Sequence, residues 1–333
     1  MYRTETLLSA LENRPPRLQL EELDLGLPST FALWNSPGFH VFESRFEEEP
    51  CLRFVHKLHQ LAGNPPLNVP PVPLIEDIHH GLCGLWPLVW RYARMRHLNQ
   101  ELDAAAASTV EKLEFWKIRL QRFAERYDDH LGPSALFLRA AYRGTEQQPP
   151  TAGPDWAMRR QRGLLAETTA LYHFFGMHMS ADLPALRPLA RPPSSGRSAI
   201  AADSEPNGRL REWTGSQRGR QALLHAVATL RGCEEARMAV AESAAVPSPI
   251  VRTALSASIS VMRAWMLGLG GCAPGGHGGS VVDLAQVAQS QDSDPGNWKR
   301  GGGPGPLLLD GVLLCSCAED AWARRFSSVL SGG

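Results

Sequence analysis

Residues 110–127 read VEKLEFWKIRLQRFAERY, and this stretch decides the fold class. Charged side chains occupy one side of its helical projection. Apolar side chains recur on the other side at intervals of three and four residues: Leu113, Trp116, Leu120, Phe123 and Tyr127. A stripe with this period is the mark of an α-helix with one buried face. The stretch therefore predicts an amphipathic helix.

The same spacing predicts helices elsewhere in the chain. Longer ones are expected over 159–179, after Trp213 through Leu230, and from Ser248-Pro249 through Leu269, where Pro suits the first helical turn. Shorter ones are expected over 134–141, 281–288 and 319–330. Pro87 predicts that residues 75–102 form one or two short helices, because proline is awkward in a helix interior.

Strand signals are weak throughout. We find no alternating segments bounded by two-residue hairpin turns, so a sizeable sheet is not expected. The predicted fold class is all-α, an irregular helical domain with long Pro- and Gly-rich loops and a partly disordered N-terminus.

Glycine and proline cluster between the helical segments. The chain has 30 Gly and 26 Pro in 333 residues, and residues 192–208 form a polar linker rich in Ser, Gly and Pro. Composition therefore predicts a partly disordered leader over 1–50, a helical domain over 51–270, and Gly-rich loops with C-terminal helices over 271–333.

Charge and apolar content limit the partners. Lys plus Arg and Asp plus Glu number 34 each, so no bulk positive field is present to hold a phosphate backbone, and we expect no specific DNA binding. No signal-peptide-like start and no apolar run of about 18 residues occurs, so we expect an intracellular chain without membrane spans. The six cysteines show no zinc-ligand spacing and are expected to be reduced thiols.

Histidines give the nearest approach to a metal cluster. His56 and His59 are three residues apart, and His79-His80 follow. They lack the H-E-x-x-H pattern and any placed carboxylate, so surface or loop histidines are the preferred interpretation. His173 and His178 are expected to form a packing pair.

Acidic, glycine-rich and basic groups complete the candidates. Asp128-Asp129 could bind a metal on a pyrophosphate, but a solvated helix end is preferred because no second carboxylate helix accompanies the pair. The glycine runs at 275–279 and 301–306 lack the Lys-Ser/Thr of a phosphate loop and are expected to be linkers. The basic groups at 91–96 and 159–162 are expected to be solvated helix faces.

Four boxes in a fixed order carry a family resemblance. They are Leu27-Pro28 with Leu33-Trp34, the LYHF stretch 171–174 with Asp182-Leu183, the segment WTGSQRGRQALLHA at 213–226, and the Ala-rich helix 254–267 with Trp265. Together, over roughly residues 25 to 270, they resemble the C-terminal half of the fungal-specific transcription factor domain. That domain is the α-helical regulatory region found behind C2H2 or Zn₂Cys₆ DNA-binding modules.

The resemblance implies a nuclear regulator of transcription that acts by contacts. Its partners would be the transcriptional machinery or a related regulator, with possible self-association. It implies no catalytic residues, no cofactor and no metal in this chain, because zinc belongs to an N-terminal cysteine-rich module whose cysteines are absent here. It implies structural roles for the matched residues Leu33, Trp34, Leu171, His173, Trp213, Arg220, His225 and Trp265.

A rival hypothesis comes from another class of protein. An intracellular all-α biosynthetic enzyme could use Asp128 and Asp129, or the His79-His80 pair, at its active site. Carboxylates or histidines that converge in a pocket would favour this enzyme, and scattered ones favour the regulator.

Overall fold

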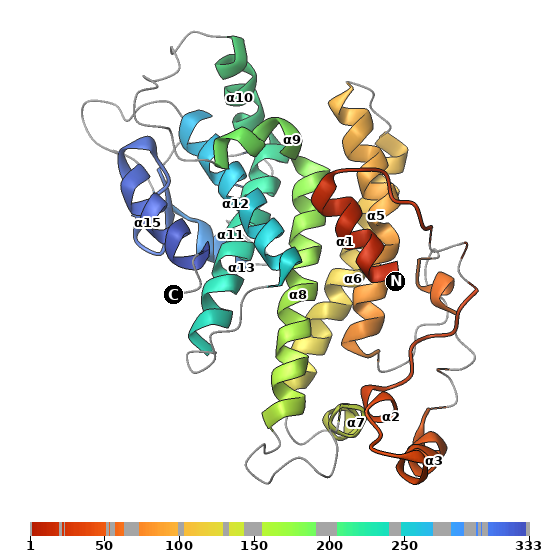
Figure 1. The fold of residues 1–333 in the computed structure, drawn as a ribbon. Coiled ribbons are helices and arrows are strands. Elements are labelled where there is room, and N and C mark those ends of the chain that lie inside the picture. The colour runs from red at the N-terminus through yellow and green to blue at the C-terminus, as the bar shows by residue number, and fades with distance from the viewer. Residues whose placement is uncertain are drawn as a thin grey trace. The chain divides into compact units, whose positions relative to one another are not determined.

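The computed structural model consists mainly of α-helices, as the periodicity predicts (Figure 1). The described residues also form one small three-stranded sheet. The described residues are 2–19, 22, 24–50, 53, 57–62, 73–98, 103–128, 133–142, 155–190, 205–239, 248–268, 281–289, 298, 301 and 306–330.

The chain forms two compact units. Unit 1 comprises Met1–Arg91 and Leu102–Tyr172, and unit 2 comprises Tyr92–Glu101 and His173–Gly333. The boundaries therefore differ from those at 50 and 270 that composition suggested. Composition reports where loops lie, whereas the units are defined by contacts between segments that are distant in sequence.

Unit 1 is helical. Its elements are α1 (Tyr2–Glu12), α2 (Phe31–Trp34), α3 (Phe39–Glu48), a 3₁₀ helix (Leu58–Ala62), the greater part of α5 (Ile75–His97), α6 (Asp103–Asp128), α7 (Pro133–Ala141) and most of α8 (Asp155–Ser180).

The first 50 residues hold three of these helices, although their sequence has no sustained apolar period. In α1 the buried positions are Tyr2, Thr6, Ser9 and Ala10. They follow a helical spacing, but small polar side chains occupy two of them. A pattern that counts only apolar residues therefore misses this helix.

The core of unit 1 contains the predicted stripe of α6. Leu113, Trp116, Leu120 and Phe123 are all buried, which confirms that amphipathic helix. On α5, Trp86 is also fully buried, and its Nε1–H donates to Ser9 Oγ of α1 at 2.7 Å. Large indole rings thus fill the space between these helices, and each buries much apolar area.

Helix α5 runs unbroken through Pro87, which corrects the prediction of one or two short helices. Proline removes one backbone hydrogen bond and costs about 3 kcal/mol or more in a helix interior. The neighbouring Leu82, Trp86 and Val89 have no exposed surface. Burying each such side chain contributes about 1.5–3 kcal/mol, so tertiary packing outweighs the local defect.

Unit 2 contains the ends of α5 and α8 and the rest of the chain. Its further elements are α9 (Leu183–Leu186), a 3₁₀ helix (Arg187–Ala190), α10 (Glu205–Gly215), α11 (Gln217–Ala239), α12 (Pro249–Gly268), β1 (Val282–Asp283), α13 (Leu284–Gln289), β2 (Leu307–Leu309), β3 (Val312–Leu313), a 3₁₀ helix (Ser316–Ala318) and α15 (Glu319–Leu330).

The core of unit 2 lies where α11 and α12 pack together. The predicted stripe of α11 is entirely buried: Leu223, Ala226, Val227 and Leu230. On α12, Leu255, Met262 and Trp265 are buried, and the helix begins at Pro249 directly after Ser248. Both helices are therefore confirmed.

The small sheet contains a hairpin that the sequence analysis missed. Strand β2 pairs with β1 in parallel and with β3 antiparallel, and Leu309 faces Val312 across a two-residue turn. The turn residues Asp310 and Gly311 both have positive φ, 50° and 81°. Asp-Gly is the preferred sequence for such a turn, and the sheet is small, as expected.

Several predicted loops fall outside the described residues. These are residues 192–204 of the polar linker, the glycine run 275–279 and residues 302–305 of the second run. Residues 205–208, the last of the predicted linker, form the first turn of α10.

Two glycines test the packing of unit 1. A Cβ at Gly81 of α5 would overlap the Trp116 indole, whereas a Cβ at Gly163 of α8 would meet nothing. Gly81→Ala gains helix propensity but overpacks the core, and overpacking costs about 1–3 kcal/mol. We expect chemical denaturation to show a lower free energy of unfolding for Gly81→Ala and a gain of about 0.4–1 kcal/mol for Gly163→Ala. Stabilisation by both variants would contradict this packing.

Candidate functional site

The residues matched in the family resemblance divide between the two units. Leu33, Trp34 and Leu171 belong to unit 1, and the other five belong to unit 2. Within unit 2, boxes that are far apart in sequence come into contact.

Two histidines of separate boxes face each other. Nδ1 of His173, on α8, lies 3.0 Å from Nδ1 of His225, on α11. Gly176 is one turn after His173, and a Cβ there would overlap the His225 ring. The absence of a side chain at Gly176 therefore allows α11 to approach α8 at this point. Because two neutral rings can share one N–H, the pair suits a donor–acceptor contact inside a packed helix interface.

The two matched tryptophans of unit 2, Trp213 and Trp265, each donate to a backbone carbonyl. Trp213 Nε1–H donates to Ser180 O at the end of α8, at 3.0 Å, and Trp265 Nε1–H donates to Gly219 O at 3.1 Å. Arg220 donates from Nη1 to Gly215 O at 2.7 Å. The carbonyls of Ser180 and Gly215 lie at the C-terminal ends of α8 and α10, where they otherwise lack partners within the helix. The matched residues thus join α8, α10, α11 and α12.

In unit 1 the matched Leu-Trp pair behaves differently. Thr30 caps α2, and its Oγ1 accepts from the backbone N–H of Leu33 at 3.4 Å. Leu33 is buried, but Trp34 is 76% exposed. A large apolar side chain on the surface is unfavourable in water, and groups of them mark interaction sites.

Helix α3, which packs beside α2 (Figure 1), carries more such side chains. Phe39, Phe42 and Phe46 are 69%, 40% and 49% exposed. The spacing of three and four residues puts them on one side of the helix, and the Phe42 and Phe46 rings stack at 5.9 Å. Glu43 and Glu47 are also exposed and lie on the flank of that side, since Glu43 is one turn after Phe39 and Glu47 is one turn after Glu43. We call these five residues the aromatic–acidic face.

Helix α3 also buries a charge. Arg45 is 3% exposed, and its Nη1 donates to Ala32 O at 2.6 Å and to Asn35 O at 3.3 Å. These are carbonyls at the end of α2. The helix therefore turns its cation inward and its phenylalanines outward, which is the reverse of an ordinary surface helix.

A buried polar network holds this inverted helix to unit 1. At the end of α3, Glu49 accepts from the Thr30 N–H at 2.7 Å and from Thr30 Oγ1–H at 2.6 Å. Arg53 lies 3.8 Å from Glu49 and donates two bonds of 2.9 Å to Asp77 of α5. Asp77 also accepts from the Leu74 N–H at 2.9 Å, which caps α5. The network runs from α5 to α2 and α3.

The Arg53–Asp77 pair is buried and bidentate. Arg53 and Asp77 are 2% and 0% exposed. Burial acts to lower the pKa of Arg53, but the hydrogen bond and charge of Asp77 outweigh it, and the pKa is raised. Arg53 therefore stays charged. Bidentate geometry is the strongest form of this contact and fixes orientation as well as distance.

The histidines of the rival enzyme hypothesis lie in helices rather than in loops. His79 is 1% exposed on α5, with Nδ1 at 3.1 Å from Thr168 Oγ1 of α8. His80 is half-buried, with Nδ1 at 2.6 Å from Glu76 O. Burial lowers the pKa of both. The expectation of surface histidines is wrong here, because the ring can replace an apolar side chain when a neighbour accepts its N–H.

The other residues that were weighed as metal ligands do not form a described cluster. His59 is in the 3₁₀ helix Leu58–Ala62, while His56 and Asp129 lie outside the described residues, as does the side chain of Asp128. In the parts of the chain that the structure describes, no three His, Cys, Asp or Glu side chains gather in a metal-binding arrangement.

His173 and His178 do not pack on each other. His173 faces His225, and His178 meets the Phe174 ring edge to face at 4.6 Å. Burial lowers the pKa of His178 to about 3, so the ring is neutral. Arg96 is likewise not on a solvated face, since Nη1 donates to Met179 O at 2.7 Å and Nη2 to His178 O at 3.0 Å. The partners of His178 and Arg96 both lie near the end of α8, and no sequence pattern predicts these contacts.

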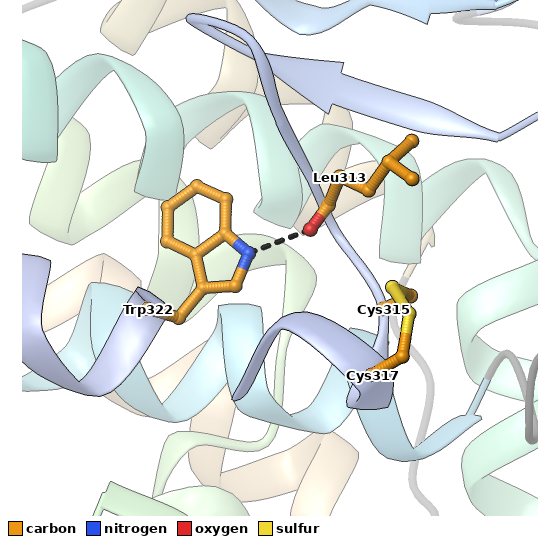
Figure 2. The surroundings of a disulfide bond; sticks show 4 residues. All are labelled: Leu313, Cys315, Cys317 and Trp322. Atoms are coloured by element: carbon orange, nitrogen blue, oxygen red, sulfur yellow. Dashed lines mark hydrogen bonds between the residues drawn. A yellow bond between two sulfur atoms is a disulfide. The ribbon is translucent and has the colours of Figure 1, made fainter. Parts of the chain in front are cut away.

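The cysteines also differ from expectation. Cys315 and Cys317 form a disulfide, so the prediction of reduced thiols is wrong for this pair (Figure 2). The chain turns through the 3₁₀ helix Ser316–Ala318, which brings the two Cα atoms to 5.4 Å, within the range for a disulfide. Cys83 and Cys233 are free thiols.

Comparison with known proteins gives no match. No protein-family model, no curated protein and no solved structure matches this chain. Among the described helices, none is long and apolar enough to cross a membrane.

Sequence reasoning missed the aromatic–acidic face. Its signal is present in FHVFESRFEE, residues 39–48, where Phe39, Phe42 and Phe46 follow a helical spacing with Glu beside them. The segment is too short to show a sustained period. The sequence also does not indicate that the phenylalanines face outward. The orientation of α3 depends on the hydrogen bonds from Arg45 to the carbonyls of α2, which no local pattern predicts.

Asp77→Ala tests the network. It leaves the Arg53 guanidinium buried without its carboxylate, and breaking such a pair costs about 3–5 kcal/mol. We expect urea titration to show a loss of this size. Lys117→Ala is the matched control, because it breaks an exposed ion pair with Glu114, and such pairs contribute about 0–1 kcal/mol. Equal, small losses for both variants would show that Arg53 and Asp77 do not organise this unit.

Proposed function

We propose that this chain is a regulatory domain of the fungal-specific transcription factor type, which acts in the nucleus by binding other proteins. In this proposal the chain performs no catalysis and makes no specific DNA contact itself. The family assignment draws support from the order of the four boxes and from the contacts that join three of them in unit 2: His173 with His225, Trp213 with Ser180, and Trp265 with Gly219.

The observation that carries the proposal is the aromatic–acidic face of α3. Phe39, Phe42 and Phe46 are exposed in a row. Burying a phenylalanine side chain contributes about 1.5–3 kcal/mol, so a partner that covers this row gains substantial binding energy. An amphipathic helix that presents anchors at such spacing is suited to a hydrophobic groove on another protein.

The charge of the face specifies the partner. Glu43 and Glu47 are exposed beside the phenylalanines, while Arg45 is turned inward to the carbonyls of α2. The face is therefore apolar and negative. Its complement is a groove lined by apolar side chains and rimmed by Lys or Arg. Acidic residues interspersed with aromatic ones are typical of segments that activate transcription. We therefore assign the face to a coactivator with such a groove.

A tethered reporter measures this function directly. The full chain is fused to the DNA-binding module of an unrelated protein in a fungal reporter strain, and transcription of the reporter is measured. We expect the fusion to raise transcription above the level of the module alone. Phe42→Ala with Phe46→Ala should abolish the rise, because each anchor lost costs roughly 2 kcal/mol, or about 30-fold in affinity.

Ile118→Ala is the matched control. Ile118 is 46% exposed on α6, like Phe46, but lies outside the aromatic–acidic face. This variant should keep full reporter activity, and all variants should keep the thermal midpoint of the parent because the replaced side chains are exposed. A fusion without effect on transcription, or an unchanged effect in the double variant, would refute the proposal.

Charge reversal separates the coactivator from other occupants. Glu43→Lys with Glu47→Lys should weaken the reporter response, whereas Glu125→Lys, on an exposed position of α6, should not. If sedimentation shows instead that the chain dimerises and that Phe42→Ala with Phe46→Ala abolishes the dimer, the face belongs to a second copy of the chain. That result would also overturn the coactivator assignment.

A further inference from the structure

The disulfide Cys315–Cys317 lies between the hairpin and the last helix of unit 2. Only Ser316 separates the two cysteines. Figure 2 shows the bond beside Leu313, the last residue of β3, and Trp322 of α15. The proposed regulatory function does not use this site.

The backbone on either side of the disulfide is held by other contacts. Leu314 N–H donates to Leu307 O at 2.8 Å, and Ala318 N–H donates to Cys315 O at 3.2 Å. The buried Trp322 donates from Nε1 to Leu313 O at 2.8 Å (Figure 2). Arg325 further ties α15 to Glu234 of α11 through bonds of 2.6 and 2.7 Å. The two sulfur atoms are therefore kept near each other whether or not they are bonded.

The disulfide contributes little as a cross-link. The stabilisation from loop closure grows with the length of the closed loop, and this loop is among the shortest possible. A disulfide with a structural role would join segments that are far apart in sequence. The Arg325–Glu234 ion pair does this by joining α15 to α11. The bond can thus open without loss of the unit 2 core.

The two cysteines differ in access. Cys315 is 7% exposed, whereas Cys317 is exposed. The difference in residue exposure therefore favours attack by an external thiolate on Cys317 over attack on Cys315. The rate of thiol–disulfide exchange depends on which sulfur is attacked and on how accessible that sulfur is.

We propose that Cys315 and Cys317 form a site of reversible thiol–disulfide exchange with a small monothiol of the glutathione class. The thiolate of the monothiol attacks Sγ of Cys317 and forms a mixed disulfide. The Cys315–Cys317 bond breaks, and its electron pair goes to Sγ of Cys315, which takes up a proton. A second monothiol then attacks the mixed disulfide and releases the Cys317 thiol with the oxidised dimer.

The net reaction is balanced. Two monothiols are oxidised to their disulfide, and the protein disulfide is reduced to two thiols by two electrons and two protons. The reverse reaction closes the pair, since the thiolate of Cys315 lies beside the mixed disulfide on Cys317 and displaces the monothiol.

Two free thiols in the described part of the chain, Cys83 and Cys233, serve as internal references. Burial raises the pKa of Cys83 to about 12, and burial with the charge of Glu234 raises the pKa of Cys233 to about 11. Because the thiolate is the reactive form, both thiols are poorly reactive at neutral pH. They should therefore stay reduced where the Cys315–Cys317 pair exchanges.

The experiment equilibrates the full chain with mixtures of reduced and oxidised glutathione at pH 7, quenches with acid, and traps free thiols with N-ethylmaleimide. Mass spectrometry then follows the peptide that carries both cysteines. We expect this pair to pass from disulfide to dithiol across the series, while Cys83 and Cys233 form no disulfide. Free thiols in excess oxidised glutathione, or a disulfide that persists in excess reduced glutathione, would overturn the proposal.

Two variants test which sulfur is attacked. Cys315→Ser should accumulate a stable glutathione adduct on Cys317. Cys317→Ser should form the adduct on Cys315 at least about tenfold more slowly, because access limits the reaction. Trapping of the buried Cys83 reports whether a variant has unfolded, in which case the titration of the unmodified chain remains decisive. Equal rates at both cysteines in folded variants would contradict the assigned attack on Cys317.

Discussion

The buried ion pair between Arg53 and Asp77 is the contact on which the proposed interaction surface depends. A charge in the protein interior is stable only when it is paired and hydrogen-bonded, so the positions of both side chains are tightly fixed. Through Glu49 and Thr30 the same network fixes the start of α2 and the end of α3. The exposed phenylalanines of α3 are thus presented on a rigid support, which lowers the entropy that a partner must remove on binding.

Unit 2 is organised by different means. Its helices α8, α10, α11 and α12 meet through indole N–H groups that bond to backbone carbonyls and through the facing rings of His173 and His225. Each of these groups combines a large apolar body with one polar atom that needs a partner. Such side chains fix how helices approach more strictly than purely apolar packing does. The five matched residues that belong to unit 2 therefore have a physical role there, whatever the domain binds.

The sequence predicted those elements whose burial follows a simple rule. Helices α6, α11 and α12 each have one apolar stripe, and the stripes of α6 and α11 are buried as expected. The predictions failed where contacts between residues far apart in sequence determine the structure. Pro87 does not break α5, because the surrounding core compensates for it. The Arg53–Asp77 pair joins residues 24 apart, and no local pattern marks it. The Asp310-Gly311 turn was within reach of the sequence, since Asp-Gly is a strong hairpin signal, but its flanking strands are too short to alternate.

We propose that the aromatic–acidic face of α3 contacts a basic-rimmed groove on a transcriptional coactivator. Photo-crosslinking tests it most directly, with a benzophenone amino acid placed at Phe42 of the full chain in fungal cells and, for comparison, at Ile118. We expect a covalent adduct from position 42 alone, to a protein of the transcription machinery, with the crosslinked peptide in an apolar groove bordered by Lys or Arg. No adduct at position 42, or the same adducts from both positions, would contradict it.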